Sequence, residues 1–132
     1  MLLRLIKSFV PAIVWAVLIT GMDLIPANPI KSHEQKWIIG PDKFIHFTQH
    51  FIFSALLFWG FLYKNIENKR RIYLSVLLPA LLGIVIEIVQ ELWVPNRHFN
   101  IKDIYANVIG SLFLLLFTKT ITNFQKNFFN PH

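Results

Sequence analysis

The chain has no cysteine and few acidic residues. Its 132 residues include seven Asp or Glu against thirteen Lys or Arg, which gives a formal net charge of +6. Without cysteine the chain can form neither a disulfide framework nor a thiolate metal site. Internal repeats and low-complexity tracts are also absent, and the length suits one domain. We therefore treat residues 1–132 as a single domain.

The sequence also lacks a long polar stretch that could form a water-soluble domain. Hydrophobic residues make up 55% of the chain, and a soluble domain of this size would expose much of that apolar content. A basic balance often indicates nucleic-acid binding. Here, however, the Lys and Arg residues lie in short clusters between apolar runs, as they do in membrane proteins. We therefore expect membrane lipids as partners and no nucleic acid.

Four apolar segments are each near the roughly 20 residues that cross the hydrocarbon core of a bilayer. They cover residues 9–25, 44–63, 72–94 and 101–118. The first follows Arg4 and Lys7, as in a signal peptide, but has no small-residue cleavage site, so we interpret it as an uncleaved span. The predicted fold class is all-α, an integral membrane four-helix bundle.

Basic residues predict the orientation of the spans, because loops rich in Lys and Arg stay in the cytoplasm. The turn after the second span, YKNIENKRR, carries four basic residues, and others lie near both termini. The first outer loop also carries three lysines, so basic residues are not confined to the predicted cytoplasmic side. We expect a multi-pass protein of the cytoplasmic membrane with both termini inside.

The polar residues within the spans lie at the predicted outer side. Residues three or four apart share a helix face, and a charge that faces lipid is costly. Three such faces are His46, Gln49, His50 and Phe53; Gly83, Glu87, Gln90 and Val94; and Asp103, Asn107 and Gly110. They predict one outward-facing polar cavity, and the two glycines allow neighbouring helices to approach closely.

Two segments resemble a known family. They are DKFIHF, residues 42–47, and EIVQELWVPNRHFNIKDIYANVIGS, residues 87–111. Their order and spacing resemble the VanZ-like family of small bacterial membrane proteins over most of the chain. His50 departs from the pattern, since family members more often have an aromatic or apolar residue there. The positions that match are Asp42, Lys43, His46, Phe47, Glu87, Gln90, Arg97, Asp103, Asn107 and Gly110.

The resemblance implies an integral membrane protein of the bacterial cell envelope. Some relatives are linked to resistance against teicoplanin, a lipoglycopeptide that acts on the outer wall. His46, Glu87 and Asp103 are the candidates for acid–base catalysis, because imidazole and carboxylate groups exchange protons. Basic side chains suit an anionic headgroup. The expected ligand-binding residues are Asp42, Lys43, His46, Glu87, Gln90, Arg97, Asp103 and Asn107.

Structural interpretations stay open for several of these residues. Asp42 follows Gly40 and Pro41 and can act as a helix N-cap. Asn100 followed by Asp103 resembles a capping box, with Asp in place of the usual Glu or Gln. The charged residues can also pair with one another, which fixes geometry and adds little net stability.

A metal site is another alternative. It would use His46 and His50, whose spacing places two imidazoles on one helix face, together with Glu87 or Asp103. That set depends on His50, which departs from the family pattern. We therefore expect no metal and no cofactor.

Three functions stay open, and enzymatic activity stays open with them. The favoured one is an outward-facing cavity that binds an anionic lipid-linked wall precursor or a lipophilic, teicoplanin-type antibiotic. The second is a membrane-embedded enzyme that acts on a lipid phosphate or wall intermediate. The third is a small carrier or scramblase, which four spans without an inverted repeat favour least unless the chain oligomerises.

Overall fold

The structure is a computed structural model that describes residues 2–26, 40–64 and 66–129. Within these residues it is entirely helical, as predicted. The helices are α1 (Leu2–Asp23), α2 (Pro41–Tyr63), α3 (Asn68–Trp93), α4 (Ile101–Phe113) and α5 (Thr118–Phe129), with a short 3-10 helix, η1 (Leu114–Leu116), before α5.

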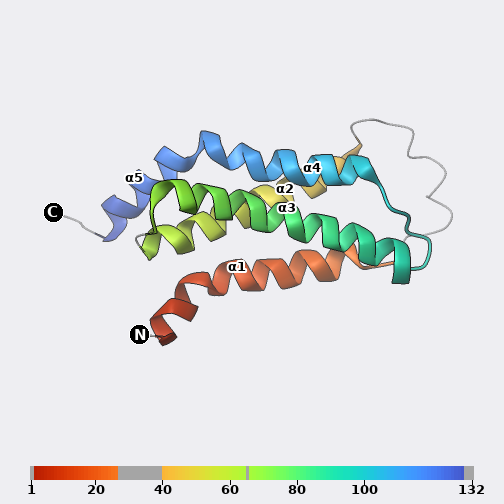
Figure 1. The fold of residues 1–132 in the computed structure, drawn as a ribbon, viewed down its shortest axis with the longest axis horizontal. Coiled ribbons are helices and arrows are strands. Elements are labelled where there is room, and N and C mark those ends of the chain that lie inside the picture. Colours follow the sequence, from red (N-terminus) through yellow and green to blue (C-terminus); the bar gives the residue numbers. More distant parts are fainter. Residues whose placement is uncertain (1, 27–39, 65, 130–132) are drawn as a thin grey trace.

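Helix α2 contacts α1, α3 and α4, and α3 also packs against α4. The long helices run alongside one another (Figure 1). The start of α1, the turn from α2 to α3, and α5 lie at one end, which we call the terminal end (Figure 1). The turn from α3 to α4 lies at the opposite end, which we call the turn end. The start of α1 and helix α5 thus lie at the same end, and the expected topology with both termini inside stays a prediction.

The described residues are polar inside and apolar outside. More polar than hydrophobic side chains are buried, including His50, Glu87 and Asn107. Large apolar side chains face outward, for example Val17 at 67% exposure and Leu116 at 71%. Water disfavours such a surface, whereas hydrocarbon accepts it and requires that polar groups be satisfied internally. This distribution supports a membrane protein.

Helices α2 and α3 are long and apolar enough to cross a membrane, and a third crossing is reached if α4 and α5 form one bent span. The second and third predicted spans, 44–63 and 72–94, therefore correspond closely to helices. The fourth differs, because α5 begins after a bend of 53°. The apolar run ends at Phe117, directly after the 3-10 helix η1. Short 3-10 helices are common at the ends of α-helices. A crossing by α1 stays a prediction.

Helix starts decide between the capping interpretations. Helix α2 begins at Pro41 after Gly40, with no side-chain cap, so the N-cap interpretation of Asp42 is wrong. Asn100 does cap α4, because its side chain accepts the Lys102 backbone N–H at 3.1 Å. Asp103 does not complete a capping box, because the Asn100 backbone N–H donates to Glu87 instead.

The two predicted contact glycines lie where helices meet. A Cβ atom at Gly110 would collide with the backbone of Phe47 on α2. A Cβ atom at Gly83 would collide with the side chain of Asn107 on α4. Both glycines therefore permit the close approach of helices that the sequence predicts.

We expect Gly110→Ala to lower the free energy of unfolding in detergent by about 1–3 kcal/mol, because the added methyl group overpacks the contact between α2 and α4. Gly21→Ala is the matched control, since Gly21 also lies in a helix but has open space around its Cβ position. That variant should be neutral or slightly stabilising, because Ala is the better helix former. Denaturant titration followed by circular dichroism measures both, and equal effects would contradict the close contact.

Candidate functional site

An ion-pair bridge between α2 and α4 forms the centre of the candidate site. The Lys43 ammonium lies 2.9 Å from Asp42 Oδ2 on its own helix. It also pairs with Asp103 Oδ1 on α4. The side chains of Lys43 and Asp103 are 13% and 8% exposed, so little water screens the attraction. One ammonium therefore joins two carboxylates from two helices.

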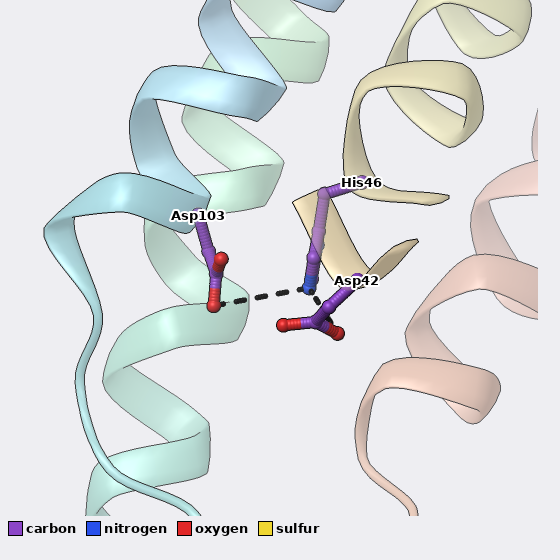
Figure 2. Close-up of side chains that lie close together, drawn as sticks. All are labelled: Asp42, His46 and Asp103. Carbon is purple, nitrogen blue, oxygen red and sulfur yellow. Dashed lines mark ion pairs between the residues drawn. The ribbon is translucent and has the colours of Figure 1, made fainter. Parts of the chain in front are cut away.

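His46 faces the same two carboxylates from the next turn of α2 (Figure 2). Its Nε2 atom lies 3.9 Å from Asp42 Oδ1 and 4.0 Å from Asp103 Oδ2. These separations exceed hydrogen-bonding distance, so one nitrogen and two oxygens surround a small space. Among the described residues, His46 Nδ1 has no hydrogen-bond partner.

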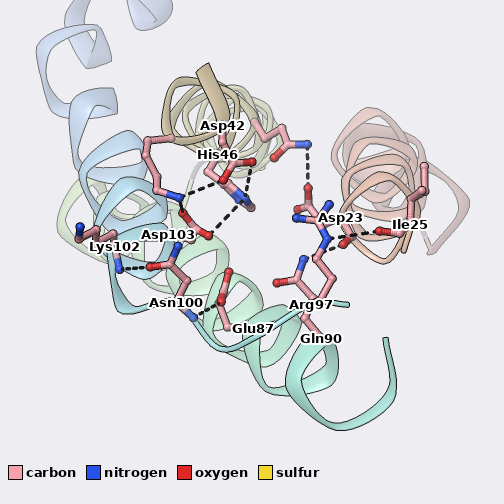
Figure 3. Close-up of polar contacts among 12 residues, drawn as sticks. Asp23, Ile25, Asp42, His46, Glu87, Gln90, Arg97, Asn100, Lys102 and Asp103 are labelled. Carbon is pink, nitrogen blue, oxygen red and sulfur yellow. Dashed lines mark hydrogen bonds and ion pairs between the residues drawn. The ribbon is translucent and has the colours of Figure 1, made fainter. Parts of the chain in front are cut away.

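Glu87 lies on α3 and is fully buried. Its Oε2 atom accepts the backbone N–H of Asn100 at 2.9 Å. Its Oε1 atom has no hydrogen-bond partner within the described part of the chain. Glu87 interacts electrostatically with Asp103, His46 and Lys43, and its carboxylate is directed toward Asp103 and His46 (Figure 3). We call Asp42, Lys43, His46, Glu87 and Asp103 the turn-end cluster.

A comparison with Glu91, one helical turn further along α3, shows which contacts are particular to Glu87. Glu91 also accepts a backbone N–H from the turn, that of Phe99 at 2.6 Å. Its side chain is 48% exposed and its Oε2 lies 3.8 Å from the exposed imidazole of His98. Both glutamates fasten the turn between α3 and α4, but only Glu87 presents a second oxygen to the interior.

A second polar group surrounds Asp23 at the end of α1 (Figure 3). Gln49 Nε2 donates to Asp23 Oδ1 at 3.2 Å, and Gln90 Nε2 donates to the Asp23 backbone oxygen at 2.6 Å. Arg97 Nε donates to the backbone oxygen of Ile25 at 3.3 Å. Two of the expected ligand-binding residues, Gln90 and Arg97, thus attach the end of α1 to α3 and its following turn.

With this geometry established, comparison with known proteins assigns the chain. The model of the VanZ/LLP1 family matches residues 2–122. The chain belongs to the VanZ/LLP1 family. No curated protein and no solved structure gives a match. Family membership confirms the resemblance carried by residues 42–47 and 87–111, and together with the apolar helices it supports a membrane protein.

Sequence reasoning missed Asp23 in this VanZ/LLP1 chain. Asp23 is only 6% exposed and receives hydrogen bonds from two other helices. The sequence signal that could have identified Asp23 is a carboxylate placed near the end of the first apolar segment. Gln49 belongs to the predicted polar face of α2, although it is not among the expected ligand-binding residues.

Asn107 and His50 lie deeper than the turn-end cluster. Asn107 is 1% exposed and faces Gly83 on α3. His50 is fully buried beside the backbone of Pro79. In the described ranges, the side chains that could share a metal ion are Asp42, His46 and Asp103. The alternative metal set built on His46 and His50 is therefore not the one that the structure assembles.

The polar interior continues from His50 toward the terminal end. Ser54, Ser75 and Ser111 are fully buried, one on each of α2, α3 and α4. Ser111 Oγ donates to the backbone oxygen of Asn107 at 2.8 Å. The bundle therefore has a polar axis, and the turn-end cluster is its most highly charged part.

Two of the hollows among the described residues are candidate places for a ligand. An apolar groove of about 380 Å³ lies between α1 and α2, lined by Ala12, Ile13, Ala16, Val17, Thr20, Phe53 and Leu57. A polar hollow of about 400 Å³ at the terminal end includes Arg71 and Lys119. The outward-facing cavity stays a prediction, because residues 27–39, which connect α1 to α2, lie outside the described residues.

Proposed function

We propose that this VanZ/LLP1 protein is a multi-pass four-helix protein of the bacterial cytoplasmic membrane that binds the phosphate-bearing headgroup of a lipid-linked wall precursor. The observation that carries the proposal is the convergence of ionisable side chains from α2, α3 and α4 at the turn end. Buried charges are costly in a membrane and usually mark a functional site.

The apolar groove supports a lipid as the ligand. Its walls on α1 and α2 consist mostly of Ala, Val, Ile, Leu and Phe side chains, which suit an acyl or prenyl chain. Gln49 and Asp23, the next polar residues toward the turn end, lie on the same two helices. A lipid whose tail occupies this groove would carry its headgroup toward the turn-end cluster. A lipophilic antibiotic has the same division into apolar and polar parts.

Lys43 and Arg97 are the cations that a phosphate would meet there. Lys43 belongs to the cluster, and Arg97 lies across from it beside Asp23 (Figure 3). Ammonium and guanidinium groups form strong charge-assisted hydrogen bonds with phosphate. This pair supports headgroup binding in preference to recognition of the lipid tail alone.

The position of His46 favours turnover of the headgroup as a second candidate function. Its Nε2 faces one oxygen of Asp42 and one of Asp103. Imidazole groups exchange protons readily, and His46 is placed to take a proton from an attacking hydroxyl group. Glu87, with one oxygen free within the described residues, supplies a second proton-exchanging group for a leaving group.

We expect His46→Gln to weaken binding of a prenyl phosphate at least tenfold, because a hydrogen bond to a charged group contributes about 1.5–3 kcal/mol. Titration of the lipid into protein in nanodiscs measures the affinity. His98→Gln is the matched control, since His98 has an 87% exposed side chain in the same region. Equal affinities for wild type and His46→Gln would contradict the binding site. Mass spectrometry of the recovered lipid separates binding from turnover.

The absence of native cysteine allows a direct test of the proposed orientation. On intact cells, a membrane-impermeant maleimide should label His98→Cys in the turn between α3 and α4. It should not label Lys69→Cys, which lies at the start of α3 beside other basic residues that favour the cytoplasmic side. Labelling of Lys69→Cys alone would reverse the topology.

A further inference from the structure

Each aspartate of the turn-end cluster uses one oxygen for Lys43 and directs the other elsewhere. Lys43 pairs with Asp42 Oδ2 and Asp103 Oδ1. The remaining oxygens, Asp42 Oδ1 and Asp103 Oδ2, are the ones that face His46 Nε2. Lys43 therefore fixes both carboxylates from behind while three ligand-type atoms point at a common space (Figure 2).

The spacing of these atoms suits a metal ion. The three ligand atoms lie within 4.8 Å of one another, and the two distances that involve His46 are 3.9 and 4.0 Å. A divalent ion with bonds of about 2.1 Å holds its ligands up to about 4.2 Å apart. A small inward movement of the side chains would complete the coordination.

A second observation, independent of the aspartates, also indicates a cation. Glu87 is fully buried and its Oε1, without a partner among the described residues, belongs to the carboxylate directed at the same space. Lys43 already serves two carboxylates, so it does not neutralise Glu87 as well. Burial of an uncompensated carboxylate is expensive, and a divalent cation would remove that cost.

We propose that Asp42, His46 and Asp103 bind one first-row divalent cation, with Glu87 beside it and Lys43 as the positioning residue. Two carboxylates and one imidazole on one side of an ion leave coordination positions open. An oxygen of a lipid phosphate would occupy one of them, and this part of the inference rests on the proposed function. The proposal departs from the sequence-based expectation of no metal, which stays untested.

The ion resolves an electrostatic difficulty of the site. The carboxylates at the turn end are those of the buried Asp23, Glu87 and Asp103 and the partly buried Asp42, against the cations of Lys43 and Arg97. The four carboxylates outnumber the two cations, and the excess negative charge repels a phosphate. A divalent cation offsets that excess and binds phosphate oxygens directly. Lys43 in turn orients the ligands through their second oxygens, as outer-shell groups do at metal sites.

The test measures metal binding without any lipid. Full-length protein in detergent, stripped with EDTA, is titrated with Mn²⁺ and followed by electron paramagnetic resonance. We expect one Mn²⁺ per chain, displaced by Zn²⁺, with a pulsed-resonance coupling to an imidazole nitrogen. That coupling is read on the wild-type protein, so it does not depend on a variant that folds.

Two histidine variants show which imidazole gives the nitrogen coupling. His46→Gln should abolish the nitrogen coupling and weaken Mn²⁺ binding at least tenfold. His98→Gln should leave both unchanged, although His98 lies beside Glu91 and forms the nearest surface alternative. The inference is overturned if Mn²⁺ does not bind in a 1:1 ratio, if no nitrogen coupling appears, or if His98→Gln removes the coupling.

Prenyl phosphate binding with and without EDTA separates the two proposals. Mn²⁺ bound with nitrogen coupling but no lipid binding supports the metal site and removes the proposed headgroup function. Lipid binding that EDTA does not change, without Mn²⁺ binding, supports the function and removes the metal. Lipid binding that requires the ion supports both.

Discussion

The arrangement of the turn end depends on one largely buried ammonium group that two carboxylates share. Lys43 joins Asp42 on α2 to Asp103 on α4, and this contact sets which oxygens remain for His46. Removing one partner of a buried ion pair leaves an uncompensated charge, which typically costs 3–5 kcal/mol. The bridge therefore links the position of α4 to the geometry of the site.

The helix packing is adapted to the same constraint. Gly110 lets the backbone of α4 approach that of Phe47 on α2. Phe47 follows His46 directly in the sequence, and Lys43 lies one turn earlier on the same helix. The turn after α3 is fastened by Glu87 and Glu91 through backbone N–H groups. Carboxylates that would be costly in lipid thus meet backbone donors, an ammonium group or an imidazole. Among the described residues the exterior is mostly apolar, whereas several buried polar atoms, Glu87 Oε1 among them, have no hydrogen-bond partner.

Local spacing made much of this predictable. The polar faces of α2, α3 and α4 follow from positions three and four residues apart, as do the contact glycines, because helical geometry relates near neighbours. The motif residues 42–47 and 87–111 also indicated the family. These features depend on the sequence within a single helix or on a pattern of motifs along the chain.

Partners across helices were less predictable. Glu87 meets the backbone of Asn100, whereas Gln90 and Arg97 contact the end of α1, because turn geometry and helix rotation decide such pairings. The positive φ of 60° at Asn96, a conformation that Asn tolerates better than most residues, helps to set that turn. The bend before α5 and the role of Asp23 likewise depend on tertiary contacts. Sequence spacing alone does not encode them.

A double-mutant cycle on Lys43→Met and Asp103→Leu tests the bridge most directly. Unfolding free energies in detergent would be compared for wild type, both single variants and the double variant. The account predicts that each single change is strongly destabilising and that the double variant is more stable than the sum of the two losses implies, by at least about 1 kcal/mol. Strictly additive losses would show that Lys43 and Asp103 act independently and would contradict the shared-ammonium bridge.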